Sequence, residues 1–200
     1  MTDALARLLS RRSTAVKDLA APAPSEAKLE QILRVATRVP DHGKLCPWRI
    51  VVLTPEGALK LGAIAADVFA KQNPDASEAQ IAAEHTRFAR APLCVAVLCT
   101  PVLGTKPVWE QELSAGAVCM NMLHAAHALG FGAKWLTEWV AYDAKILAAL
   151  WQASPAPKQG AAAVMPAGTR VAGFMYVGSK TAETPDRERP VLSDVVATYG

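Results

Sequence analysis

The chain is poor in aromatic residues and has no long apolar run. Aromatic residues make up 6% of its 200 residues, whereas hydrophobic residues make up 52%, so the core must be built mainly from Ala, Val and Leu. The longest apolar stretches, such as LCVAVLCT, are far shorter than the roughly 20 residues that span a bilayer. We therefore expect a soluble protein with no membrane partner.

Several catalytic and nucleotide-binding motifs are missing as well. The sequence contains no GxGxxG after its first expected strand, no GxxxxGK[ST], no HExxH and no GxSxG. These absences exclude the Rossmann, P-loop, zincin and α/β-hydrolase interpretations. His124 and His127 stand three residues apart in an apolar segment, but no acidic or cysteine ligand accompanies them at similar spacing. We expect no metal site there, with one histidine buried and the other on the helix surface.

Neither sign of charge dominates, and the cysteines show no pairing pattern. The 21 basic and 18 acidic residues give a net charge of +3 and are scattered, so we expect no nucleic-acid partner. A small excess of Lys and Arg is compatible with an anionic ligand such as a phosphate. The four cysteines form no CxxC pair, and no apolar signal peptide follows the start MTDALARLLSRRS. The expected location is a reducing cytoplasm.

Hydrophobic periodicity predicts alternating helices and strands in one domain. Helices are expected from near residue 3, from 25 to before Pro40, from 57 toward 73, over 78–90, over 108–129 and after Asp143; strands are expected over 48–54, 93–100, 132–137 and 171–177. The segment 152–169 is expected to be a long loop, and 179–200 an extended tail with a last turn at 192–198. The pattern alone gives an α+β or α/β class.

Three short segments carry candidate binding residues. Arg11, Arg12 and Ser13 offer two guanidiniums and a hydroxyl at the end of the first helix, which suits one phosphate, although they could equally solvate that helix end. Arg38 and His42 flank a tight basic corner that is either a binding loop or a surface turn. In the third segment, 130–137, small residues would let a flat ring approach the backbone.

Four segments of the chain resemble the FMN-dependent nitroreductase family, most closely its short bacterial branch. They are RRS at 11–13, RVPDHGKLCPW at 38–48, WEQELSAGAVCMNMLHAAHALGFGAKW at 109–135 and VAGFMYVGS at 171–179. The resemblance implies an α+β nitroreductase-like fold, with a mixed, mostly antiparallel sheet flanked by helices. It also implies an intertwined homodimer that holds FMN between its subunits. Residues 1–200 would then form one FMN-binding domain, with 179–200 lying on the partner subunit.

The resemblance assigns roles to the residues of these segments. Arg11, Arg12 and Ser13 match the segment that holds the FMN phosphate and ribityl chain. Arg38 and His42 match positions that reach the flavin bound mainly by the other subunit.

Further matches follow the long helix and lie in the tail. Trp135, Leu136 and Thr137 match the segment that runs alongside the cofactor, and Arg189 loosely matches a basic tail residue near the phosphate. Leu136 stands where the short branch has a basic residue.

Ala15 is a second departure from the family pattern. Many members carry Arg or Lys there, where positive charge favours the reduced anionic flavin; Lys17 is the alternative for that role.

The resemblance implies that the flavin carries the chemistry, so no side chain is expected to be catalytic. NAD(P)H would deliver a hydride and leave, and a nitroaromatic or quinone-like small molecule would then take two electrons in a ping-pong mechanism. Two alternatives stay open. One is a flavoprotein of the same fold with another redox reaction, and the other is a non-catalytic FMN-binding dimer, which the missing charge at Ala15 favours.

Overall fold

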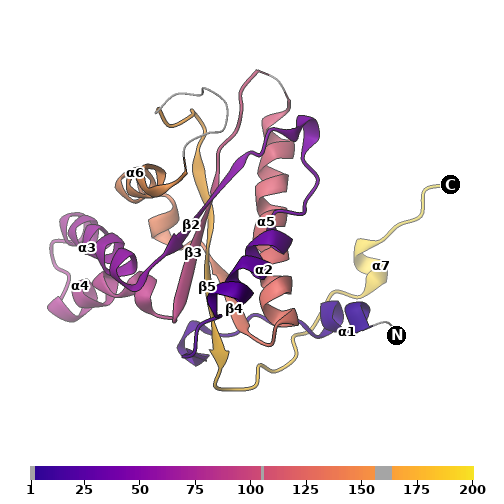
Figure 1. Cartoon of the computed structure of the whole chain (residues 1–200), viewed down its shortest axis with the longest axis horizontal. Coiled ribbons are helices and arrows are strands. Elements are labelled where there is room, and N and C mark those ends of the chain that lie inside the picture. Colours follow the sequence, from indigo (N-terminus) through magenta and orange to yellow (C-terminus); the bar gives the residue numbers. More distant parts are fainter. Residues whose placement is uncertain (1–2, 105, 156–163) are drawn as a thin grey trace.

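The computed structural model describes residues 3–104, 106–155 and 164–200. A five-stranded sheet lies between two groups of helices (Figure 1). The strands are β1 (Leu19–Ala20), β2 (Trp48–Leu53), β3 (Leu93–Cys99), β4 (Gly132–Leu136) and β5 (Arg170–Lys180). Their order is β1-β5-β3-β2, with β4 also paired to β5, and all these pairs are antiparallel.

Helices cover both faces of this sheet. One face packs against α3 (Pro55–Gln72) and α6 (Ala144–Ala153), with α4 (Glu78–His85) lying against α3, and the other against α2 (Glu26–Ala36) and α5 (Val108–Ala128). Two short helices, α1 (Asp3–Ser10) and α7 (Leu192–Val195), both lie beyond α5 in the view of Figure 1. The predicted α+β architecture with a mostly antiparallel sheet is confirmed.

Strand β3 belongs to two apolar cores at once. Val95 and Val97 pack in the core formed with α2 and α5, whereas Cys94, Ala96 and Leu98 pack in the core formed with α3 and α6. Successive side chains of a strand point to opposite faces, so a strand covered on both sides needs a continuous apolar run. This explains why LCVAVLC has no polar alternation and is buried throughout.

Local signals set several element ends where the sequence predicts them. The side chain of Asp143 accepts hydrogen bonds from the amides of Lys145 and Ile146 at 2.8 and 3.0 Å, which starts α6. Gly130 follows α5 with φ of 87°, in the left-handed region that ends a helix.

The helix predicted over 78–90 is shorter than expected. Helix α4 ends at His85, and a separate 3-10 helix covers Arg87–Ala89. At this end of α4 the carbonyl group of His85 packs directly on Gly62 of α3, where a Cβ atom would lie only 1.9 Å from that oxygen.

Strand β5 is longer than predicted, and strand β1 is not predicted at all. Leu19 pairs with Lys180, and Ala20 pairs with Ser179, which extends β5 beyond Val177. A two-residue strand is too short to leave a periodic pattern in the sequence.

The loop predicted over 152–169 is described only in part. Helix α6 runs into it as far as Ala153, and residues 156–163 lie outside the described part of the chain. Among the described residues, no helix is long and apolar enough to cross a membrane.

Candidate functional site

The segment 11–13 leaves α1 and runs to the beginning of β4. The amide of Thr14 donates to the carbonyl oxygen of Ala133 at 3.0 Å, and Thr14 itself is buried. Gly132 makes this approach possible, because a Cβ atom there would lie 2.8 Å from Thr14 Oγ1. The structure therefore brings the RRS segment and the GFGAKW segment side by side. The sequence analysis predicts no role for Thr14, because only the neighbouring residues 11–13 are identified there as candidate phosphate ligands.

Three guanidinium groups converge at the end of α1. Burial, followed by the charges of Arg189 and Arg12, holds the pKa of Arg11 below its ordinary value. Arg189 comes from the tail, so the structure does bring it to the residues it was expected to join. Like charges repel at short range, and an anion placed among them would relieve that repulsion.

Arg12 is held by several acceptors but leaves one donor unused. Its Nη1 atom donates to the carbonyl oxygens of Leu9 and Arg11 at 2.8 and 2.9 Å, and its Nη2 atom pairs with Asp186 of the tail. Its Nε atom is buried and has no hydrogen-bond acceptor in the described chain. A buried donor of this kind indicates a missing acceptor. The hydroxyl of Ser13 is exposed beside it.

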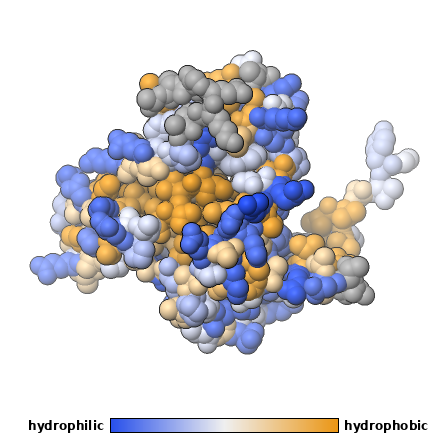
Figure 2. Space-filling model, viewed as in Figure 1, coloured by the Kyte–Doolittle hydropathy of each residue, from blue (hydrophilic) through white to orange (hydrophobic). Residues whose placement is uncertain are grey.

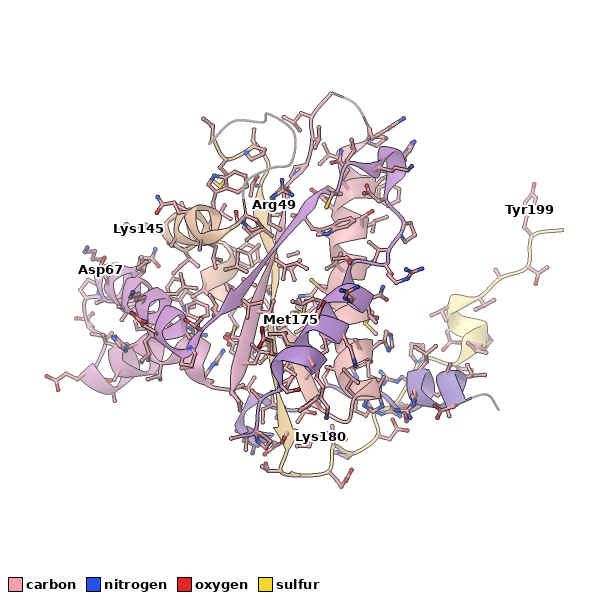
Figure 3. The ribbon with its side chains drawn as sticks, viewed as in Figure 1. Arg49, Asp67, Lys145, Met175, Lys180 and Tyr199 are labelled. Atoms are coloured by element: carbon pink, nitrogen blue, oxygen red, sulfur yellow. The ribbon has the colours of Figure 1, made fainter. Side chains whose placement is uncertain are left out.

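Two histidines of α5 face the same cations. Burial and then Arg11 lower the pKa of His124, while burial, Lys180 and Arg11 are the main causes that lower the pKa of His127. Figure 3 shows Lys180 at the end of β5. The expectation of one buried and one surface histidine is wrong, since both are half-buried. The three-residue spacing of the two histidines predicts that they share a helix face, but only the tertiary structure brings that face close to Arg11.

His42 lies near the start of α5, away from this cluster, whereas Arg38 lies beside the middle of the helix. His42 Nδ1 is 2.7 Å from Glu110 Oε2, near the start of α5. Arg38 is exposed, and its carbonyl oxygen accepts from Asn121 Nδ2 at 3.0 Å. Arg7 marks the other end of α5, where its guanidinium donates to the carbonyl oxygen of Ala128 at 2.8 Å. Positions 110 and 128 are roughly 27 Å apart on a helix, so one chain does not bring His42 to Arg11.

The segment 135–137 divides between the two faces of the sheet. Trp135 donates from Nε1 to the carbonyl oxygen of Ala172 at 3.0 Å and lies against Gly173, where a Cβ atom would be 2.0 Å from Nε1. Leu136 packs on the opposite side, in the core formed with α3 and α6. Thr137 is half-buried just beyond the strand. The backbone of this segment thus continues along β4 from the point that Thr14 contacts.

Within residues 3–104, 106–155 and 164–200, no group of three or more His, Cys, Asp or Glu side chains could hold a metal ion.

Comparison with known proteins fits this geometry. The sequence model of the "Nitroreductase family" matches residues 8–169. The chain belongs to the nitroreductase family. The matched segment contains every predicted site residue except Arg189.

Two curated members of the nitroreductase family are similar over much of their length. A protein of Haemophilus influenzae with the name "Putative NAD(P)H nitroreductase" is 36% identical over 141 residues, which cover 69% of this chain and 74% of that protein. The "Putative NAD(P)H nitroreductase YdjA" of Escherichia coli is 41% identical over 140 residues, covering 66% of this chain and 71% of that protein.

Solved structures of the nitroreductase fold superpose on the whole chain. A nitroreductase-like protein of Bacillus cereus has a TM-score of 0.75 at 18% identity, covering 100% of this chain and 97% of that one. A nitroreductase of Bacteroides fragilis with bound FMN has a TM-score of 0.71 at 18% identity and full coverage of both chains. The predicted nitroreductase-like fold is confirmed.

Proposed function

We propose that this chain is one subunit of a homodimeric, FMN-dependent oxidoreductase. It would take a hydride from NAD(P)H and pass two electrons to a nitroaromatic or quinone-like acceptor by a ping-pong mechanism. The observation that carries this proposal is the convergence of Arg11, Arg12 and Arg189 beside the β4 backbone. The names of the curated relatives and the FMN in the Bacteroides fragilis structure point to the same chemistry.

The donors at the end of α1 fit the FMN phosphate. Forked guanidinium groups match the geometry of phosphate oxygens, and the buried Arg12 Nε atom lacks an acceptor that an oxygen would supply. Arg189 would close this group from the tail, with Ser13 on the ribityl chain. When bound, FMN supplies the ring that accepts the hydride and returns the electrons.

The ring of the cofactor would lie along Trp135, Leu136 and Thr137. These residues supply a flat backbone edge rather than a nucleophile or a proton donor. Their task in the reaction is to bind and orient the ring and to keep water from one side of it. No catalytic side chain is assigned, in keeping with the absence of a triad motif in the sequence.

A second copy of the chain would complete the site. One stripe of α5 carries Trp109, Leu113, Gly116, Ala117 and Met120; Trp109 and Leu113 are 63% and 56% exposed, and a Cβ atom at Gly116 would meet no atom within 4 Å. Apolar residues at this spacing, with small ones in the middle, suit close packing of two helices. Antiparallel packing of two α5 helices would bring Arg38 and His42 of one subunit toward Arg11 of the other.

The ends of the chain supply further apolar surface for the same dimer. Leu5, Leu8 and Leu9 of α1 and Leu192 and Val195 of α7 are all exposed. Figure 2 shows this surface around α1 and α7, beside the main body. Residues 1–200 would form one FMN-binding domain, with 179–200 extended over the partner subunit. Exposed apolar surface of this extent is typical of an interface.

Two measurements test the proposal. The purified protein is expected to show the absorbance bands of oxidised flavin, and stopped-flow mixing with NADH or NADPH is expected to bleach them. Addition of nitrofurazone or menadione should then restore them and support steady turnover. Protein that binds no FMN, or flavin that neither nucleotide reduces, would contradict the proposal.

A non-catalytic FMN-binding dimer is the second candidate, because Ala15 carries no charge for the flavin ring. Lys17, in the 3-10 helix Val16–Asp18, is exposed and two residues further on. Bound flavin that is never reduced by NAD(P)H would favour this candidate. Reduction by NAD(P)H without transfer to either acceptor would instead favour the same fold with another redox reaction.

A further inference from the structure

Glu138 has a backbone conformation that residues with a side chain rarely adopt. Its φ is 53° and its ψ is −178°, at the edge of a region that belongs almost entirely to glycine. It directly follows Thr137, the last residue of the segment proposed to lie along the cofactor ring. Such conformations persist only where the surrounding structure fixes them, and they gather at ligand sites.

An ionic network holds the side chain of Glu138. Its Oε2 atom accepts from Arg87 Nη1 at 2.8 Å and from Arg90 Nη2 at 2.6 Å. Arg87 is mostly buried and also pairs with the carboxylate of Glu84, which is itself buried. Two arginines from the 3-10 segment after α4 therefore hold a residue that lies about 50 positions later in the chain.

The network is tied to the rigid core on its far side. Glu84 accepts a further bond from Trp139 Nε1 at 3.2 Å, and the hydroxyl of the buried Tyr176 donates to the carbonyl oxygen of Arg87 at 3.2 Å. Arg90 Nη2 is 3.3 Å from the same hydroxyl. Tyr176 lies on β5, the central strand, so the carboxylate of Glu138 is fixed relative to the sheet.

Stability alone does not account for this arrangement. Partly buried ion pairs contribute little net stability, because the charges lose hydration, and the strained φ of Glu138 is unfavourable as well. A glycine at this position would adopt the same backbone conformation without a network. What the network secures is a fixed direction for the peptide between Thr137 and Glu138.

We propose that Glu138 is a positioning residue, which Arg87 and Arg90 hold so that the Thr137–Glu138 peptide presents its polar atoms to the flavin ring. This inference rests on the proposed FMN site. The carboxylate acts through the backbone and touches neither cofactor nor substrate. The arginines would thereby tune the affinity and the redox potential of a group that they do not contact.

Three substitutions of Glu138 in the full-length, flavin-loaded protein test this role. Glu138→Ala and Glu138→Gln keep the strain but lose the charged anchor, so we expect the FMN dissociation constant to rise about 10-fold or more. Glu138→Gly relieves the strain, and its dissociation constant should stay within about 3-fold of the parent. The flavin midpoint potential should shift in the Ala and Gln variants and return toward the parent value in the Gly variant.

A double variant separates positioning from simple destabilisation. Arg90→Ala should weaken FMN binding in the parent protein but much less in the Glu138→Gly background, because the backbone no longer needs its anchor there. Circular dichroism melting of each variant, with and without FMN, checks that the protein is folded.

Several outcomes would overturn the inference. It fails if Glu138→Ala binds FMN with unchanged affinity and potential, or if Glu138→Gly is as impaired as Glu138→Ala. It fails as well if the Ala variant alone cannot fold while the folded Gln variant keeps the parent potential. Failure of the proposed function looks different: the parent protein would then bind no FMN, or Arg11→Ala would leave binding unchanged.

Discussion

Arg11 carries its charge in unfavourable surroundings. Burial and the guanidiniums of Arg189 and Arg12 all disfavour the protonated form, which is why its pKa is lowered. The flavin-free protein therefore contains an electrostatic repulsion that a bound phosphate would remove. Binding of the anion should be strong and sensitive to salt.

Arg11→Ala is expected to weaken FMN binding by about 1.5–3 kcal/mol, the range for a hydrogen bond to a charged group. Fluorescence quenching titration of free FMN measures this directly. Arg34→Ala is the matched control, because Arg34 is an exposed arginine that pairs with Glu30 on α2. The melting temperature of the flavin-free protein should not fall in Arg11→Ala. Equal FMN affinity in Arg11→Ala and Arg34→Ala would remove Arg11 from the site.

The histidines near Arg11 predict a pH dependence. The pKa of His124 and of His127 is lowered, by burial first, so the unfolded chain takes up protons more readily than the folded one below the ordinary value of 6.5. Stability should therefore be lost as the pH falls through that value.

Melting curves of the flavin-free protein between about pH 7.5 and pH 5.5 test this pH dependence. The parent protein should lose more stability over this range than the variant in which His124 and His127 are both Gln. Identical losses in the two proteins would show that neither histidine is responsible.

At the level of elements, the crossing of α3 and α4 depends on one glycine. A Cβ atom at Gly62 would lie 1.9 Å from the carbonyl oxygen of His85 and 2.7 Å from its carbonyl carbon. Both are backbone atoms, so the two helices would have to move apart. The contact lies at the end of α4, two residues before Arg87 of the arginine network.

Gly62→Ala should lower the free energy of unfolding by about 3 kcal/mol, the upper range for overpacking a core. The sign of the change in the free energy of unfolding is diagnostic, because Gly→Ala inside a helix otherwise stabilises a protein by about 1 kcal/mol. Urea denaturation of the parent and the variant measures the difference. A stabilised variant would mean that α3 and α4 do not meet in this way.

The sequence predicts most elements because local signals and periodicity agree. Asp143 and Gly130 mark helix ends, and the apolar run of β3 marks a strand covered on both faces. It does not predict β1, which forms only by pairing with the distant β5, or the end of α4, where His85 packs on Gly62. The same holds for the site: the sequence indicates the RRS segment, whereas only the tertiary structure brings Lys180 and the α5 histidines near Arg11, or Arg87 and Arg90 to Glu138.

At the scale of the described molecule, large apolar side chains are exposed at α1, at the α5 stripe and along the tail. Tyr199 stands far from the rest of the chain in Figure 3 and is fully exposed. In a single chain His42 lies near the start of α5, and the arginine cluster lies near its other end. The proposed two-fold dimer would join these two half-sites, and this makes a strict prediction about mixed dimers.

Arg11→Ala and Arg38→Ala subunits, co-expressed with different tags, should complement each other. In the mixed dimer one site receives both substitutions and the other receives neither, so one FMN per dimer should bind with the parent affinity. Each homodimer should bind FMN weakly at both sites. Flavin content and a binding titration of the purified mixed dimer measure this.

Sites built within one chain would give the opposite result, because each site of the mixed dimer would then carry one substitution. Weak binding at both sites of the mixed dimer, or parent affinity in the Arg38→Ala homodimer, would contradict the shared site.

The cysteines provide a second way to measure dimer assembly. All four lie within the described chain, and Cys46 alone is exposed. Burial raises the pKa of Cys99 to about 11 and the pKa of Cys119 to about 12, and it raises the pKa of Cys94 further still. Thiols held protonated inside the core react slowly with maleimides, because the thiolate is the nucleophile. A fluorescent maleimide should thus label each subunit once, four residues after His42, and energy transfer between the two dyes would follow dimer assembly without any engineered cysteine.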